Sequence, residues 1–173
     1  MTPFYSRCPE TAARETRELY LPPSEDASAD DASPQGRFLL VEWYCENPKC
    51  DCRRVLLGVC RDVPKLNPDE TVFMINFGWE SPEFYLRWRK GDPTDPRDVE
   101  FAREMAGATV DSFAGPRPDA EGMQLFEIVK RFVLSDLTYV ARLARHYAEF
   151  RAKVKPPSAS LPWNLRRKSK RLR

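Results

Sequence analysis

The sequence contains a single histidine, His146, and only seven glycines among 173 residues. One imidazole leaves little material for an acid–base triad, and no His-Glu-x-x-His helix is present. The glycines form no phosphate-cradling loop, and no serine stands in a nucleophile elbow. Carboxylates near the predicted sheet show no spacing that selects a facing catalytic pair: Glu42, Asp51, Glu80 and Glu83.

Long apolar runs are also missing. No uninterrupted stretch approaches the roughly 18 to 20 residues of a membrane span, and residues 1–7 lack the apolar core of a signal peptide. We therefore expect a cytoplasmic protein without a membrane contact. In that reducing compartment, an odd set of five cysteines favours metal ligands plus spare thiols over a disulfide framework.

The charge is small overall but unevenly distributed. The formal net charge is +2, with 28 basic and 26 acidic residues. Nine of the basic residues and none of the acidic ones lie between Arg151 and the last residue, so residues 1–150 carry 19 basic against 26 acidic groups, a balance of −7. This asymmetry fits either a tail that contacts nucleic acid or a solvated tail beside an acidic body.

The apolar patterns predict an α+β fold. Aliphatic and aromatic runs predict a mostly antiparallel sheet of four to five strands, at about residues 16–21, 38–44, 54–60, 71–79 and 83–88. A short helix is expected at 98–105 and loop at 107–122. Two C-terminal helices should cover the sheet with apolar stripes, and Asp136 should cap the second helix. The stripe of the first helix consists of Leu125, Phe126, Val129, Phe132 and Val133. The stripe of the second consists of Tyr139, Val140, Leu143, Tyr147 and Phe150.

Length and composition predict one domain with tails. At 20.1 kDa the chain suffices for a single ordinary core. We expect residues 1–155 to form one zinc-stabilised α+β domain, with a disordered loop near 22–36 where small and polar residues dominate. Residues 156–173 should form a basic, disordered tail.

The most informative stretch is residues 44–53, which places Cys45, Cys50 and Cys52 on a turn between two predicted strands. Three thiols at this spacing provide soft ligands for zinc, which takes four ligands in a tetrahedron. Asn47-Pro48 marks the reversal and gives the turn the character of a zinc knuckle. Free structural cysteines and a Cys-x-Cys redox pair are the alternatives.

The fourth ligand must come from elsewhere in the chain. Cys60 follows an extended segment that would carry it roughly 26 Å from Cys52, so a buried position at a strand end suits it better. His146 stands beside Arg142, Arg145 and Glu149, which predicts a partly exposed histidine. Cys8 precedes Pro9, which favours an extended knuckle, and it also precedes a probable strand. We therefore predict a structural site formed by Cys8, Cys45, Cys50 and Cys52, with Cys60 and His146 left open as alternatives to Cys8.

These residues resemble a known group. The pattern Tyr-Cys-x-Asn-Pro-x-Cys-Asp-Cys-Arg at 44–53, with Cys8-Pro9-Glu10 upstream and Arg145-His146-Tyr147 downstream, is similar to a group of uncharacterised bacterial proteins with a Cys-x4-Cys-Asp-Cys-Arg signature. The resemblance covers about residues 8 to 150, and the decapeptide is its specific part. It implies a bacterial source and metal binding, and it brings no established activity.

Three functions follow from these observations. The first is a zinc-binding protein with a structural site and a non-enzymatic interaction or adaptor role, which has a protein partner of unknown identity. The second is nucleic-acid binding by the basic tail, through Arg166, Arg167, Lys168, Lys170 and Arg171. Exposed aromatic residues of a sheet could add base stacking, although core packing explains the same residues. The third is a thiol redox or metal-dependent enzyme.

Overall fold

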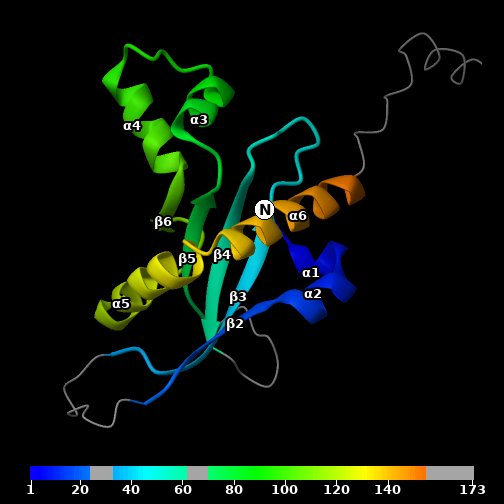
Figure 1. Cartoon of the computed structure of the whole chain (residues 1–173), viewed down its shortest axis with the longest axis vertical. Helices are drawn as coiled ribbons and strands as arrows, with labels where there is room; N and C mark the ends of the chain where they lie inside the picture. The colour runs from blue at the N-terminus through cyan, green and yellow to red at the C-terminus, as the bar shows by residue number, and fades with distance from the viewer. Residues whose placement is uncertain (24–32, 62–69, 155–173) are drawn as a thin grey trace, which may run out of the picture.

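A computed structural model describes residues 1–23, 33–61 and 70–154 of the chain. Its centre is a six-stranded antiparallel sheet in the order β1-β3-β4-β5-β6, with β2 also paired to β3 (Figure 1). The predicted α+β class is confirmed, with six strands in place of four to five. The strands are β1 (Thr2–Pro3), β2 (Arg17–Leu21), β3 (Gly36–Tyr44), β4 (Arg54–Arg61), β5 (Thr71–Gly78) and β6 (Gly107–Asp111).

The helices lie between and after the strands. Those before β3 are α1 (Phe4–Arg7) and α2 (Pro9–Glu15), and those between β5 and β6 are α3 (Pro82–Arg89) and α4 (Pro96–Met105). The C-terminal set consists of α5 (Ala120–Ile128), a π-helical segment η2 (Val129–Val133) and α6 (Leu137–Lys153). None of the helices in the described ranges has the length and apolar character that a bilayer span requires.

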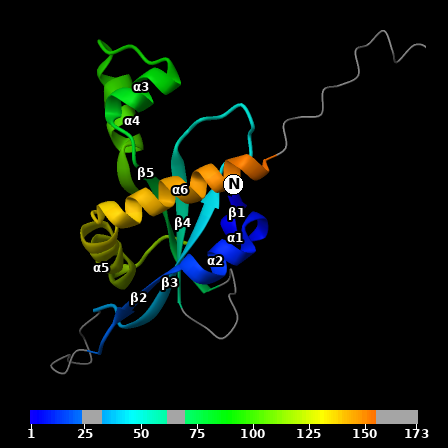
Figure 2. The ribbon, with the colours of Figure 1, turned by 45° about the vertical axis from the view of Figure 1, so that its right-hand side comes forward.

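The core forms where α6 and its neighbours cover the sheet. Strand β4 is central, and all of its residues except Arg61 are buried, which explains its unbroken apolar run. Figures 1 and 2 show α6 crossing one face of the sheet, with α1 and α2 on one side and α5 on the other. One buried cluster joins strand and helix side chains, among them Phe38, Leu40, Leu57, Ile75, Leu125, Val129, Leu143 and Phe150.

Most of the predicted apolar stripe faces this core, but Phe132 does not. Its side chain is 63% exposed, whereas its neighbours Val129 and Val133 are buried. The reason is the π-helical geometry of η2, which widens the turn and rotates residues away from the regular helical spacing. Asp136 caps α6 as predicted, because its carboxylate accepts a hydrogen bond from the Thr138 amide at 2.9 Å.

Two predicted elements are wrong. The segment 83–88, expected as a strand, is the helix α3, because Ser81 caps it by accepting from the Phe84 amide and Pro82 occupies the first turn. Lys90 in the left-handed region then ends it. The segment 107–111, expected as a loop, pairs with β5 as β6. All five residues of β6 are half-buried, so the segment lacks the alternation of apolar and polar residues by which a strand is predicted from sequence.

Two other expectations fall largely outside the described residues. The disordered loop near 22–36 falls mainly on residues 24–32, and the basic tail falls on residues 156–173, so both stay predictions. The described residues at the border of that loop, 36–40, pair with β2.

Candidate metal centre

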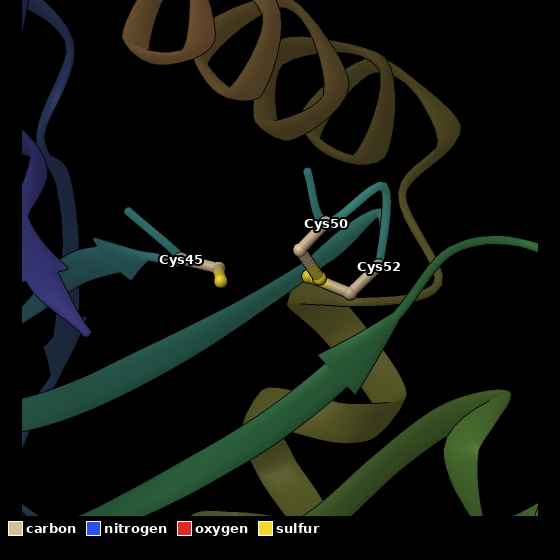
Figure 3. Close-up of side chains that lie close together, drawn as sticks. All are labelled: Cys45, Cys50 and Cys52. Atoms are coloured by element: carbon tan, nitrogen blue, oxygen red, sulfur yellow. The ribbon is translucent and has the colours of Figure 1, made fainter. Parts of the chain in front are cut away.

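Three cysteine sulfurs meet at the connection between β3 and β4. Cys45 follows the last residue of β3, and Cys50 and Cys52 precede the first residue of β4. Their sulfur atoms all lie within 4.8 Å of one another, and no disulfide joins them. Figure 3 shows Cys50 and Cys52 side by side with Cys45 facing them from the end of its strand. Three thiols this close could hold a metal ion.

The backbone of the connection brings these sulfurs together by local hydrogen bonds. The Asn47 side-chain oxygen accepts from the Lys49 amide at 3.0 Å, and the Asn47 carbonyl oxygen accepts from the Cys50 amide at 3.0 Å. These bonds close a turn around Pro48, which turns Cys50 back toward Cys45. The predicted reversal at Asn47-Pro48 is therefore confirmed.

Helix α6 holds the same connection from the side. Arg151 donates from Nη1 to the carbonyl oxygen of Asn47 at 2.6 Å and from Nη2 to that of Pro48 at 2.8 Å. One turn earlier, the Tyr147 hydroxyl lies 3.4 Å from Oδ1 of Asp51. Two side chains on one face of α6 thus contact the backbone and side chain of the cysteine connection. The turn has a fixed position on the folded domain.

The residue after Cys52 is held in an unusual conformation. Arg53 has a φ of 47°, in the left-handed region that residues with a Cβ seldom adopt. Its carbonyl oxygen accepts from the Tyr85 hydroxyl at 2.9 Å, and its guanidinium pairs with Glu80 at 3.0 Å and with Asp51. Helix α3 therefore supports the connection through Tyr85. These contacts compensate the backbone strain and fix the direction in which Cys52 leaves the turn.

The thiols are in an environment that suits a bound cation. Burial, and then the neighbouring Cys50 and Cys45, raise the pKa of Cys52 to about 12. Burial and then Cys45 also raise the pKa of Cys50. Three thiolates within this distance repel one another, so they ionise together only when a cation neutralises them. The same raised pKa values argue against the redox alternative, which needs a thiolate of low pKa.

A buried arginine lies next to this group. Arg54 is 9% exposed, its Nε has no hydrogen-bond partner among the described residues, and its guanidinium contacts the Met105 sulfur and the Tyr85 ring. Burial disfavours its charge and lowers its pKa. A metal with three thiolates would carry net negative charge two residues away and would offset the buried guanidinium.

Cys8 does not belong to the group of three sulfurs, although we predicted it as the fourth ligand. It lies between α1 and α2, where its amide donates to the Phe4 carbonyl at 2.8 Å and its carbonyl accepts from Ala12 at 2.9 Å. Its buried thiol is beside Glu149 and Lys153 of α6. Pro9 opens a helix here instead of extending a knuckle, because its fixed φ is also suited to the first helical turn.

The other two candidates also lie apart from the group. Cys60 is buried near the far end of β4, with its sulfur 3.5 Å from the Thr71 hydroxyl, as the extended segment predicts. His146 is 1% exposed, so the expectation of a partly exposed histidine is wrong. Its ring stacks on Phe4 with 4.5 Å between the ring centroids.

His146 belongs to a buried polar network that the sequence analysis missed. Its Nδ1 lies 2.9 Å from Oε2 of Glu42, its Nε2 lies 3.1 Å from Oε2 of Glu15, and the Tyr44 hydroxyl donates to Glu42 at 2.8 Å. Each ring nitrogen thus faces a carboxylate, which only accepts when ionised, so the arrangement is satisfied when both nitrogens carry protons. The helical spacing of the sequence could have indicated that His146 is buried, because Leu143, His146 and Phe150 share one helical face.

No protein-family model, curated protein or solved structure matches this chain. The similarity to the bacterial group with the Cys-x4-Cys-Asp-Cys-Arg signature and the cytoplasmic location stay predictions. The predicted nucleic-acid contacts at Arg166, Arg167, Lys168, Lys170 and Arg171 lie outside the described residues.

Proposed function

We propose that this protein binds one zinc ion through the thiolates of Cys45, Cys50 and Cys52 and uses it in a non-enzymatic interaction role. The observation that carries the proposal is the gathering of three sulfurs within 4.8 Å of one another on one short connection. Zinc suits this donor set because it favours thiolates and a tetrahedral geometry. When bound, it would offset most of the charge of three thiolates that repel one another.

The contacts around the connection support a structural role for the ion. The turn is fixed to α6 through Arg151 and to α3 through the Tyr85 hydroxyl, which donates to the Arg53 carbonyl. Zinc would complete this set of contacts by joining the end of β3 to the start of β4. Metal binding of this kind adds directly to folding stability, because the unfolded chain has no preformed site.

The interaction role rests on the position of the sulfurs. Cys45 and Cys50 are only partly buried, whereas Cys52 is buried. The group of metal-binding side chains that gathers here among the described residues has three members, and zinc takes four ligands. The fourth ligand would therefore be solvent or a side chain supplied at the protein surface by a partner. A protein partner that contacts this connection could complete the tetrahedron.

Metal analysis of protein purified without a chelator tests zinc binding. We expect about one zinc ion per chain, and X-ray absorption should show about three sulfur atoms at about 2.3 Å with one lighter atom. Cys50→Ser should abolish stoichiometric zinc. Cys60→Ser is the matched control, because its thiol is buried at the other end of β4 and should leave the metal content unchanged. Wild-type protein with metal far below one ion per chain would refute the proposal.

A further variant decides the fourth ligand. Cys8→Ser should retain zinc, because the Cys8 thiol lies beside Glu149 and Lys153. Loss of zinc in Cys8→Ser, together with four sulfur neighbours in the absorption spectrum of the wild type, would support the four-cysteine site predicted from the sequence. It would also contradict the surface-completed site proposed here.

A further inference from the structure

A second site of different chemistry lies at the other end of α6. A cavity of about 420 Å³ opens beside the first two turns of this helix, and we call it the arginine pocket. Its size is within the range of small-molecule sites. It is lined by Arg17, Asp136, Thr138, Tyr139, Ala141, Arg142 and Arg145.

Positive side chains outnumber negative ones in the lining of the arginine pocket, which has three arginines and one carboxylate, that of Asp136. Arg145 is engaged with Glu15, and Asp136 caps α6. Arg17 and Arg142 have no ion pair with any described residue, and both instead lie over the ring of Tyr139, with 6.0 Å and 4.8 Å between guanidinium carbon and ring centroid. One guanidinium from β2 and one from α6 therefore converge without an ion pair to any residue that the structure describes.

Three polar atoms of the same pocket residues are buried without a partner. They are Nε of Arg17, Nε of Arg142 and the hydroxyl of Tyr139, and none has a hydrogen bond to a described residue. A buried donor without an acceptor is unfavourable, so its presence points to an acceptor that binds there. An arginine that uses Nε together with one Nη recognises a planar or tetrahedral oxyanion through two parallel bonds.

We propose that the arginine pocket binds the phosphate group of a small phosphate ester, with Arg17 and Arg142 as the anion ligands. A phosphate monoester carries close to two negative charges at neutral pH and so matches two unpaired guanidiniums better than a monocarboxylate does. The organic part of the ester would lie against the exposed Ala141, while the buried Tyr139 ring positions the two guanidiniums.

This inference is independent of the metal centre. Tyr139 and Arg151 are twelve residues apart on α6, which places the two sites about 18 Å apart along the helix axis. Loss of zinc in Cys50→Ser therefore leaves the anion ligands in place. Either site can fail its test without affecting the test of the other.

The experiment uses the full chain, with inorganic phosphate and phenyl phosphate as probes and benzoate as the carboxylate comparison. Isothermal titration at low salt should show phenyl phosphate binding more tightly than inorganic phosphate, and both more tightly than benzoate. In NMR spectra, the amide signals that shift should belong to residues 136–142 and 17. Shifts at other residues only, or no phosphate binding, would overturn the proposal without any substituted protein.

Matched variants assign the ligands. Arg142→Met and Arg17→Met remove the charge but keep most of the aliphatic chain, and each should weaken phenyl phosphate binding at least tenfold, as expected for a lost charge-assisted pair. Arg142→Lys keeps the charge but loses the two-point geometry and should give an intermediate loss. Arg103→Met, an exposed arginine on α4, is the control and should bind like the wild type.

Two results would contradict the assignment. Equal weakening by Arg103→Met and Arg142→Met would mean that only the overall charge matters. Binding of a single-stranded RNA that is sensitive to Arg142→Met, without binding of phenyl phosphate, would mean that the ligand is a nucleic-acid backbone and not a small ester. Circular dichroism of each variant separates loss of binding from loss of fold.

Discussion

His146 and Glu42 form a pair in the interior, with Nδ1 of the imidazole 2.9 Å from Oε2 of the carboxylate and side chains 1% and 4% exposed. The pair joins α6 to β3 across 104 positions of sequence. The Tyr44 hydroxyl donates to the same carboxylate, and Glu15 of α2 faces the other ring nitrogen. Three elements that are distant in sequence are thus held together by one polar network.

Breaking this pair should be costly. His146→Phe keeps an aromatic ring against Phe4 but leaves the Glu42 carboxylate buried with only the Tyr44 hydroxyl, so we expect the free energy of unfolding to fall by about 3 to 5 kcal/mol. Urea denaturation measures the effect. Adding Glu42→Gln removes the unpaired charge, so the double variant should lose less stability than the sum of the two single variants. Additive losses would show that the two side chains do not interact energetically.

The acid stability should depend on Glu15. Hydrogen bonding to Arg145, and then to His146, lowers the pKa of Glu15 to about 2 from an ordinary value of 4.5. Because the pKa is lower in the folded protein, ionised Glu15 stabilises the fold above about pH 4.5, and this contribution is lost as the pH falls toward 2. Glu15→Gln should therefore flatten the fall in melting temperature over that range.

Glu10→Gln is the control for this experiment, because it removes an exposed carboxylate from the same helix α2. Its curve of melting temperature against pH should keep the wild-type slope. A Glu15→Gln curve that keeps the same slope would show that the ion pair with Arg145 contributes nothing to acid stability.

Arg151 should govern metal affinity without being a ligand. Its guanidinium donates to the carbonyl oxygens of Asn47 and Pro48, so Arg151→Met should leave the three sulfurs in place but loosen the turn. We expect the affinity for zinc to fall about 10- to 100-fold, the usual effect of removing a group that orients ligands. Competition with a chromophoric chelator measures it. Arg103→Met serves again as the matched control, and equal affinities in the two variants would contradict this prediction.

Gly78 should not tolerate a side chain. A Cβ at this position would collide with the Met105 carbonyl oxygen and the Tyr85 hydroxyl, and would lie 2.8 Å from the Tyr85 ring carbon Cζ. Since the Met105 backbone cannot move freely, Gly78→Ala should destabilise the fold by about 1 to 3 kcal/mol. It should also weaken zinc binding, because Tyr85 holds the Arg53 carbonyl beside Cys52. Gly36→Ala is a comparison of another kind: a Cβ there has open space, but the φ of +105° strains the backbone, so this variant should lose stability without losing zinc affinity.

A stability loss in Gly78→Ala with unchanged zinc affinity would separate these two effects. It would show that α3 contributes to folding but does not position the cysteine connection. Thermal unfolding with and without excess zinc distinguishes the two results, since a bound metal raises the melting temperature only of protein that retains the site.

Features encoded in short stretches could be predicted from the sequence. The strands from 38 to 44 and from 54 to 60, the cap at Asp136 and the reversal at Asn47-Pro48 all depend on nearest neighbours. The prediction of a strand at 83–88 was wrong because it relied on the aromatic residues, which favour strands. Ser81-Pro82 starts a helix there, and this cap outweighs the weak strand propensity.

The three-sulfur group follows from the spacing of its cysteines, because Cys45, Cys50 and Cys52 are separated by so few residues that one closed turn brings them together. The other contacts of the two sites arise only when the chain folds. The tertiary structure placed Cys8 beside α6, buried His146 between two carboxylates, and brought Arg17 to Arg142. Helical periodicity can place His146 on the buried face of α6, but the partners of these side chains lie far away in sequence, so no local pattern of residues encodes which of them meet.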